Sequence, residues 1–179
     1  MPTLTLLRHA KSSWDDLVTR DFDRPLNARG QKAAATMGRH LKGEGLHFDH
    51  VVASPAVRVS ETLEQFGSGY GRALAPAWDR RIYLASAATL IDVARELPRE
   101  AKDALMVGHN PGLEDMVLLL VADRSGDVLR DAVEVKYPTA AVATITWEGD
   151  WSDLREGEAR LTRFVRPRDL DATLGPDDD

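Results

Sequence analysis

The hydrophobic positions of the chain gather into three short apolar runs that each end at polar residues. These runs cover residues 3–9, 48–54 and 104–109. Apolar runs of this length with polar ends are typical of buried β-strands. The pattern therefore predicts three strands in the interior of a sheet.

Between the apolar runs, hydrophobic residues recur at the spacing of one helical face. The helical segments are residues 27–43, 55–66 and 87–97. Strands that alternate with helices indicate a mostly parallel sheet, covered by helices on both faces and linked by right-handed crossovers. The expected fold class is α/β, with a three-layer α/β/α sandwich.

Two strand-to-helix junctions carry local helix-start signals. Ser54 is followed by Pro55, and Asn110 is followed by Pro111. Serine and asparagine are good N-cap residues, and proline is favoured at the first helical position. We therefore expect Ser54 and Asn110 to cap helices that follow their strands directly.

Two more strands are expected in the last third of the chain. Residues 141–147 and 159–165 have strand composition, and the polar loop between them contains Gly149 and Gly157. This arrangement predicts a hairpin-like pair at one side of the sheet.

The domain organisation follows from length and from the composition of the end of the chain. The 179 residues are enough for one domain with its own core. The last residues have no periodicity and finish in three aspartates. We expect a single domain over residues 1–170 and an acidic tail over residues 171–179.

The overall charge excludes several classes of partner. The formal net charge is −6 and the isoelectric point is about 5.4, so neither nucleic acid nor an anionic membrane is expected as a partner. Positive charge for an anionic substrate must then be concentrated locally. Each arginine near a candidate site is therefore more informative than the total.

Cysteine usage and hydropathy limit the chemistry and the location. The chain has no cysteine, which excludes thiol nucleophiles, disulfides and Cys-ligated zinc. The opening residues lack the pattern of a secretory signal, and no later stretch approaches the length of a transmembrane helix. A cytoplasmic location is expected.

Candidate chemistry lies at the ends of the predicted strands. Arg8 and His9 end the first strand, Arg58 lies one turn into the helix after the second, and His109 and Asn110 end the third. In an open α/β sheet these ends share one edge, where ligands bind. Guanidinium groups bind phosphoryl oxygens bidentately, and an imidazole can attack phosphorus. The set predicts a phosphate site.

Four segments resemble the successive motifs of the histidine phosphatase superfamily, also called phosphoglycerate mutase-like. They read LLRHAKSSW, RPLNARG, VVASPAVRVSET and MVGHNPGLEDM. The short length and the LRHAKSSW start resemble the SixA-type phosphohistidine phosphatases of that superfamily. The similarity runs from Thr3 to about Val165.

This resemblance implies roles for individual residues. Arg8 and His9 match the pair that bears the nucleophile, and Arg58 and His109 match the second phosphate-binding arginine and the second pocket histidine. Arg24, in the RPL segment, would bind substrate at the pocket rim or form a structural ion pair, and Asn110 is a further substrate-binding candidate. We expect no metal and no cofactor, because the arginines and imidazoles supply the positive charge that a metal ion would supply elsewhere.

Two positions depart from the family pattern. Ala10 stands where most members have glycine, so the backbone there must adopt an ordinary conformation. The family's general acid follows the middle βα unit, where Asp79 is the nearest candidate in this chain. An aspartate beside Arg80 and Arg81 is alternatively a surface ion pair.

Several alternative interpretations compete with the site residues. Arg58 could pair with Glu61 or Thr62 along an exposed helix face. A metal site at His47, Asp49 and His50 lacks a fourth ligand nearby, and GHNPG lacks the GK[ST] ending of a P-loop.

The expected function is hydrolysis of phosphohistidine, or of a small phosphomonoester, through a phosphohistidine intermediate on His9. The partner is then a phosphorylated protein or a small phosphorylated substrate. The alternatives are a phosphoglycerate mutase-like enzyme, a small-molecule phosphomonoesterase and a phosphoprotein-binding module without turnover.

Overall fold

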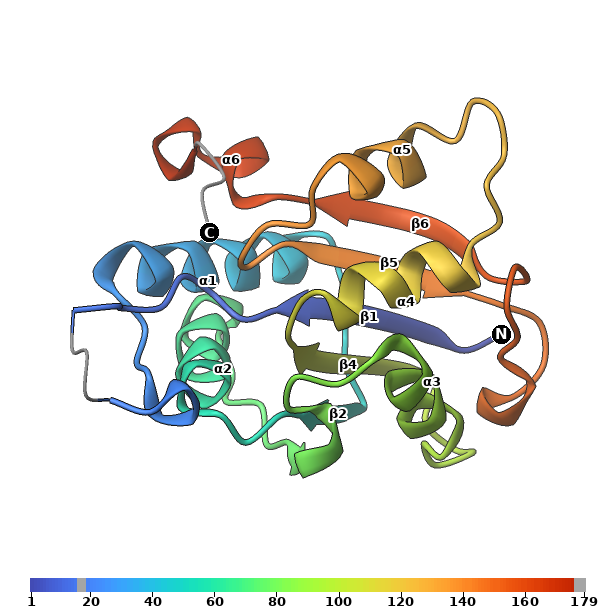
Figure 1. Cartoon of the computed structure of the whole chain (residues 1–179), viewed down its shortest axis with the longest axis horizontal. Helices are drawn as coiled ribbons and strands as arrows, with labels where there is room; N and C mark the ends of the chain where they lie inside the picture. Colours follow the sequence, from blue (N-terminus) through green and yellow to red (C-terminus); the bar gives the residue numbers. More distant parts are fainter. Residues whose placement is uncertain (16–18, 176–179) are drawn as a thin grey trace.

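The computed structural model describes residues 1–15 and 19–175. Within them, six strands form one sheet in the order β3-β2-β4-β1-β5-β6 (Figure 1). The strands are β1 (Thr3–Arg8), β2 (His50–Ala53), β3 (Ala77–Trp78), β4 (Asp103–Gly108), β5 (Val142–Thr146) and β6 (Arg160–Val165). Strands β1 to β4 pair in parallel, whereas β5 is antiparallel to both β1 and β6. The predictions of a mostly parallel sheet and of a hairpin-like pair at one side are confirmed.

Helices cover both faces of this sheet, which confirms the three-layer α/β/α sandwich. The helices are α1 (Ala28–Gly43), α2 (Val57–Tyr70), α3 (Ala87–Arg95), α4 (Gly112–Leu120), α5 (Val128–Val135) and α6 (Pro167–Leu170). Met37 and Leu41 of α1 share one core cluster with the buried side chains of α2, and buried side chains of α3, α4 and α5 belong to another. The alternation of side chains along β1 separates the two clusters, because Leu4 and Leu6 join the α4 side and Leu7 joins the α2 side.

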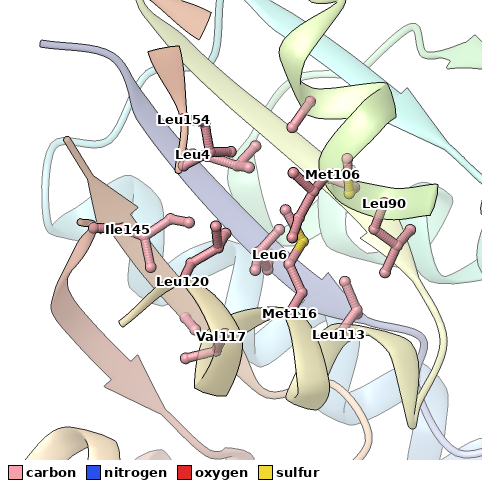
Figure 2. Close-up of a cluster of buried hydrophobic side chains, with 14 of the residues drawn as sticks. Leu4, Leu6, Leu90, Met106, Leu113, Met116, Val117, Leu120, Ile145 and Leu154 are labelled. Carbon is pink, nitrogen blue, oxygen red and sulfur yellow. The ribbon is translucent and has the colours of Figure 1, made fainter. Parts of the chain in front are cut away.

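The core on the α4 side fixes the helix that follows β4. Figure 2 shows Leu113, Met116, Val117 and Leu120 of α4 directed at Leu4, Leu6, Met106 and Ile145 of the strands. Burial of these side chains contributes roughly 1.5–3 kcal/mol each. The same packing holds the start of α4, and therefore the turn after β4, against the carboxyl end of the sheet.

Helices α1 and α2 approach each other closely on the opposite face. A Cβ atom at Gly38 would overlap the carbonyl oxygen of Phe66, and a Cβ at Gly69 would overlap that of Ala35. Only glycine permits this backbone contact. The contact fixes α2, which carries Arg58, against the rest of the molecule.

Helices α2 and α4 both begin later in the chain than the sequence predicts. Helix α2 begins at Val57, with Ala56 as its N-cap, so the prediction that Ser54 caps it is wrong. The Ser54 hydroxyl instead lies 2.8 Å from Nε2 of His109. Helix α4 begins at Gly112 with Pro111 at the N-cap position, but the Asn110 side chain still accepts a hydrogen bond from the Glu114 N–H.

Some elements have no clear signal in the sequence pattern. Strand β3 has only two residues, both exposed. Helix α5 buries only Arg130 and Val133 of its eight residues, and the sequence pattern predicts no helix there.

The packed chain continues past residue 170, where the tail was expected to begin. Residues Ala172–Leu174 form a short 3₁₀ helix, and Leu174 is buried. Arg29 donates a 2.6 Å hydrogen bond to the carbonyl of Gly175, and Lys32 pairs with Asp171. The expected boundary is therefore too early, and the rest of the predicted tail, residues 176–179, lies outside the described residues. Among the described helices, none has the length and apolar character needed to cross a membrane.

Candidate active site

The carboxyl ends of β1 and β4 bring the predicted residues into one cavity. Arg8 pairs in register with Gly108 in the neighbouring parallel strand, so His9 and His109 follow at the same edge of the sheet. Helix α2 adds Arg58, its second residue. The cavity has a volume of about 260 Å³ and is lined by Arg8, His9, Lys11, Ser12, Trp14, Asp21, Arg24, Arg58, Leu84, His109, Asn110 and Thr139.

The His9 ring is held in one tautomer. Its Nδ1 lies 2.8 Å from the carbonyl oxygen of Ala10. A carbonyl only accepts, so Nδ1 carries the proton and Nε2 keeps its lone pair in the neutral ring. Burial lowers the pKa of His9 well below its ordinary value, and the neighbouring His109, Arg8 and Arg58 add to the effect. His9 is therefore a neutral imidazole with an unprotonated Nε2.

The loop that carries His9 is fixed from several sides. The His9 N–H donates to Gly108, and the Ala140 N–H donates to the carbonyls of Arg8 and His9. The Ala10 N–H donates to the Thr62 hydroxyl over 2.9 Å, and that hydroxyl donates to the Arg58 carbonyl. One network therefore positions both the loop that carries His9 and the start of α2.

Ala10 fits this loop without a positive φ angle, as the sequence predicts. Its side chain is fully buried in a small apolar cluster with residues that include Ala33 and Ala34 of α1. The neighbouring Lys11 backbone lies directly against Gly30, where any Cβ would overlap the Lys11 carbonyl oxygen. The methyl group of Ala10 therefore packs toward α1.

His109 is the second imidazole of the cavity, and its ring centroid lies 5.3 Å from that of His9. Its Nδ1 lies 3.3 Å from Nη2 of Arg58, which can only donate, so Nε2 carries the proton and donates to Ser54. Burial and then the charge of Arg58 lower the pKa of His109 to about 3. His109 is thus neutral near pH 7.

Arg58 is buried in the site, with only 2% of its surface exposed. Its Nη1 and Nη2 donate to the backbone carbonyl and the carboxylate of Asp21, and its buried Nε has no hydrogen-bond partner. Glu61 instead accepts from the Leu26 N–H. The alternative of an exposed pair between Arg58 and Glu61 or Thr62 is therefore wrong.

Arg8 and Asn110 share one acceptor beside the cavity. Nη1 of Arg8 and Nδ2 of Asn110 each donate to the carbonyl of Tyr137 over 2.9 Å. Asn110 also accepts from the first turn of α4. Both side chains line the cavity and are held by the segment before β5.

Arg24 lines the cavity and also forms an ion pair with Asp21. Its Nε and Nη2 donate to Oδ1 of Asp21, and its Nη1 donates to Ser12 over 2.6 Å. Its guanidinium carbon lies 3.5 Å from the centroid of the Trp14 ring. Such stacking fixes the plane of the guanidinium group.

Asp21 is a site residue that the sequence patterns do not indicate. It lies in the short 3₁₀ helix η1 (Asp21–Asp23), and the Tyr83 hydroxyl donates to its carboxylate. Partial burial raises the pKa of Asp21, but the hydrogen bond from Tyr83 and the interactions with Arg58 and Arg24 outweigh it and lower the pKa to about 2. Asp21 is therefore ionised at any physiological pH.

Asp79 lies elsewhere, and its contacts do not support a role as general acid. Its carboxylate caps a short 3₁₀ helix and accepts from the backbone and the guanidinium of Arg81. The hydrogen bond from Arg81 also lowers the pKa of Asp79. Asp79 is not among the described residues that line the cavity.

The contacts of Asp49 argue against the alternative of a metal site at His47, Asp49 and His50. Its carboxylate accepts from the backbone N–H groups of Lys102 and Asp103. Over residues 1–15 and 19–175, no three histidine, aspartate or glutamate residues gather as a metal ion would require.

Comparisons with known proteins agree with this geometry. The model of the histidine phosphatase superfamily, branch 1, matches residues 4–82. An uncharacterised protein of Mycobacterium tuberculosis is 32% identical over 164 residues, which cover 90% of this chain and 100% of that protein.

Two solved structures share the fold over nearly their whole length. A protein of Nakamurella multipartitia assigned as the phosphohistidine phosphatase SixA has a TM-score of 0.79 and 29% identity, and the match covers 93% of this chain and 96% of that one. A protein of Agrobacterium tumefaciens with the same assignment has a TM-score of 0.76 and 25% identity, over 93% of this chain and 99% of that one. The expected family and the expected class of hydrolase are confirmed. The chain belongs to the histidine phosphatase superfamily, in its SixA-type branch.

Proposed function

We propose that this chain hydrolyses phosphohistidine on a protein or peptide, through a covalent phosphohistidine intermediate on His9. The observation that carries the proposal is the hydrogen bond from Nδ1 of His9 to Ala10. It leaves Nε2 with a lone pair inside a cavity whose lining includes Arg8, Arg24 and Arg58.

The reaction then takes two in-line steps. In the first, Nε2 of His9 attacks phosphorus, the bond to the leaving nitrogen breaks, and the phosphoryl group passes to His9. In the second, a water oxygen attacks the same phosphorus, the P–Nε2 bond breaks, and inorganic phosphate leaves. The guanidinium groups of Arg8 and Arg58 stabilise the charge on the phosphoryl oxygens in both steps.

His109 changes its role when an anion enters. In the unliganded site, burial and Arg58 keep it neutral. A phosphoryl dianion opposes both effects, because a nearby negative charge favours the protonated ring. Protonated His109 would then donate a hydrogen bond from Nδ1 to a phosphoryl oxygen.

The described lining of the cavity offers no carboxylic acid suited to protonate an alkoxide, which favours phosphohistidine over alkyl phosphates. Among the described residues that line the cavity, Asp21 is the only carboxylate, and its pKa of about 2 makes it a poor acid near pH 7. An alkoxide needs a well-placed acid to leave, whereas a phosphohistidine protonated on its own ring releases neutral imidazole.

Two further expectations belong to the same proposal. The arginines supply the positive charge that a metal would supply elsewhere, so catalysis should need none. We also expect a cytoplasmic location, on the basis of the cysteine-free composition.

A comparison of substrates tests the proposal. The specificity constant kcat/KM is measured for a phosphohistidine peptide, a phosphoserine peptide and a sugar phosphate, all in the presence of EDTA. We expect the phosphohistidine peptide to exceed both esters by about 100-fold or more. Equal turnover of the sugar phosphate would contradict the substrate claim and favour a phosphomonoesterase or a mutase-like enzyme.

A further inference from the structure

The carboxylate of Asp21 lies between two arginines of the cavity. Its Oδ1 accepts from Arg24 over 3.1 and 3.2 Å, and its Oδ2 accepts from Nη2 of Arg58 over 3.0 Å. The two arginines come from different parts of the chain, since Arg24 follows η1 and Arg58 lies in α2. Asp21 is therefore the group that links them.

The hydrogen-bonding capacity of Asp21 is fully used. An ionised carboxylate offers about four acceptor sites. Two are taken by Nε and Nη2 of Arg24, one by Arg58 and one by the Tyr83 hydroxyl. No acceptor site remains for a substrate or for a water to be activated, so Asp21 can act on the reaction only through its partners.

The contacts on Arg58 show which edge Asp21 holds. Nη1 and Nη2 of Arg58 both donate to Asp21, to its backbone carbonyl and its carboxylate. The edge that carries Nε is left with a buried N–H without a partner, and Nη2 of that edge also faces His109. A buried donor of this kind costs free energy until an acceptor arrives.

We propose that Asp21 is a positioning residue for phosphate binding, which holds the guanidinium groups of Arg24 and Arg58 in one arrangement at the cavity. This inference rests on the proposed function, because it concerns the same phosphate site. Fixing two guanidinium groups in advance removes an entropic cost that phosphate binding would otherwise carry.

The neighbouring Asp23 provides a matched control. It lies in the same 3₁₀ helix, its side chain is 41% exposed against 43% for Asp21, and it pairs with the exposed Arg20. It is not among the residues that line the cavity. A general effect of charge or of helix η1 would therefore appear in both variants.

The test measures the dissociation constant of inorganic phosphate by calorimetry, together with thermal unfolding. We expect Asp21→Asn to weaken phosphate binding by about tenfold or more, and Asp23→Asn to change it by less than about twofold. Asp21→Glu keeps the charge but displaces the carboxylate, so we expect it to weaken binding by about threefold or more in a folded protein.

The outcomes separate this inference from the proposed function. Phosphate binding by Asp21→Asn or Asp21→Glu that equals or exceeds that of the wild type would overturn the positioning role, and tighter binding would identify Asp21 as a competing anion. If the wild-type chain binds no phosphate, the proposed function itself is wrong.

Discussion

The Thr62 hydroxyl accepts a 2.9 Å hydrogen bond from the backbone N–H of Ala10 and so ties helix α2 to the loop that carries His9. Both residues are fully buried. The contact therefore links the His9 loop to Arg58, because Arg58 lies one turn before Thr62 in the same helix.

Replacement of Thr62 tests this link. Thr62→Val keeps the shape of the side chain but leaves the buried Ala10 N–H without an acceptor, which should cost about 1–3 kcal/mol of unfolding free energy. The His9 loop should also loosen, so kcat should fall more than KM rises. Urea unfolding and steady-state kinetics measure both effects. Thr62→Ser retains the hydroxyl and is the control; a valine variant that behaves like the serine variant would contradict the argument.

Removal of Arg58 tests the charge stabilisation. Arg58→Ala should lower kcat/KM by roughly 100- to 1,000-fold, because the proposed mechanism places this guanidinium on the phosphoryl oxygens in the transition state. Arg81→Ala is the matched control, since Arg81 forms ion pairs with Asp79 and Glu96 at the surface, and it should change kcat/KM by less than about twofold. Similar losses in both variants would argue against a specific role for Arg58.

The buried neutral state of His109 predicts a pH dependence of stability. Its pKa is about 3 in the folded protein against an ordinary value of 6.5, so the unfolded chain binds more protons between these values. Stability should therefore fall as pH decreases from 6.5 toward 3, by at most about 1.4 kcal/mol per pH unit from this residue.

Denaturant unfolding of the wild type and of His109→Gln at about pH 7 and about pH 5 checks the direction in which the unfolding free energy changes with pH. The variant should lose less stability than the wild type on acidification, because it lacks the titrating group. An equal loss in the two proteins would show that His109 does not contribute.

Chelation tests the expected independence from metals. Exhaustive treatment with EDTA should leave kcat/KM for the phosphohistidine peptide unchanged, since in the proposed mechanism the arginines supply the positive charge. Loss of activity that a single divalent ion restores would contradict this expectation and require a metal in the mechanism.

The meeting of Arg8, His9, Arg58 and His109 could be predicted from the sequence. Each residue lies at, or one turn after, the end of an apolar run, and neighbouring parallel strands bring such ends to one edge. The strong apolar pattern that predicts the sheet therefore also predicts where these side chains meet.

Other features depend on packing that no local pattern records. Asp21 lies in a three-residue 3₁₀ helix without hydrophobic periodicity, and only the fold brings it to Arg58, 37 residues away. Serine is a residue type favoured at N-caps, but the hydroxyl of Ser54 contacts His109, which directly follows the neighbouring strand β4. Asp79 occupies the expected region for an acid, yet Arg81, two residues later, binds its carboxylate.

The most direct test of the account is detection of the phosphoryl group on His9. The enzyme is mixed with a ³²P-labelled phosphohistidine peptide, quenched in alkali within the first turnover and analysed by peptide mapping and mass spectrometry. We expect transient label on His9 that is stable in alkali and labile in acid, and no label or turnover in a folded His9→Asn variant. Turnover by that variant, or wild-type turnover without label on His9, would contradict the mechanism.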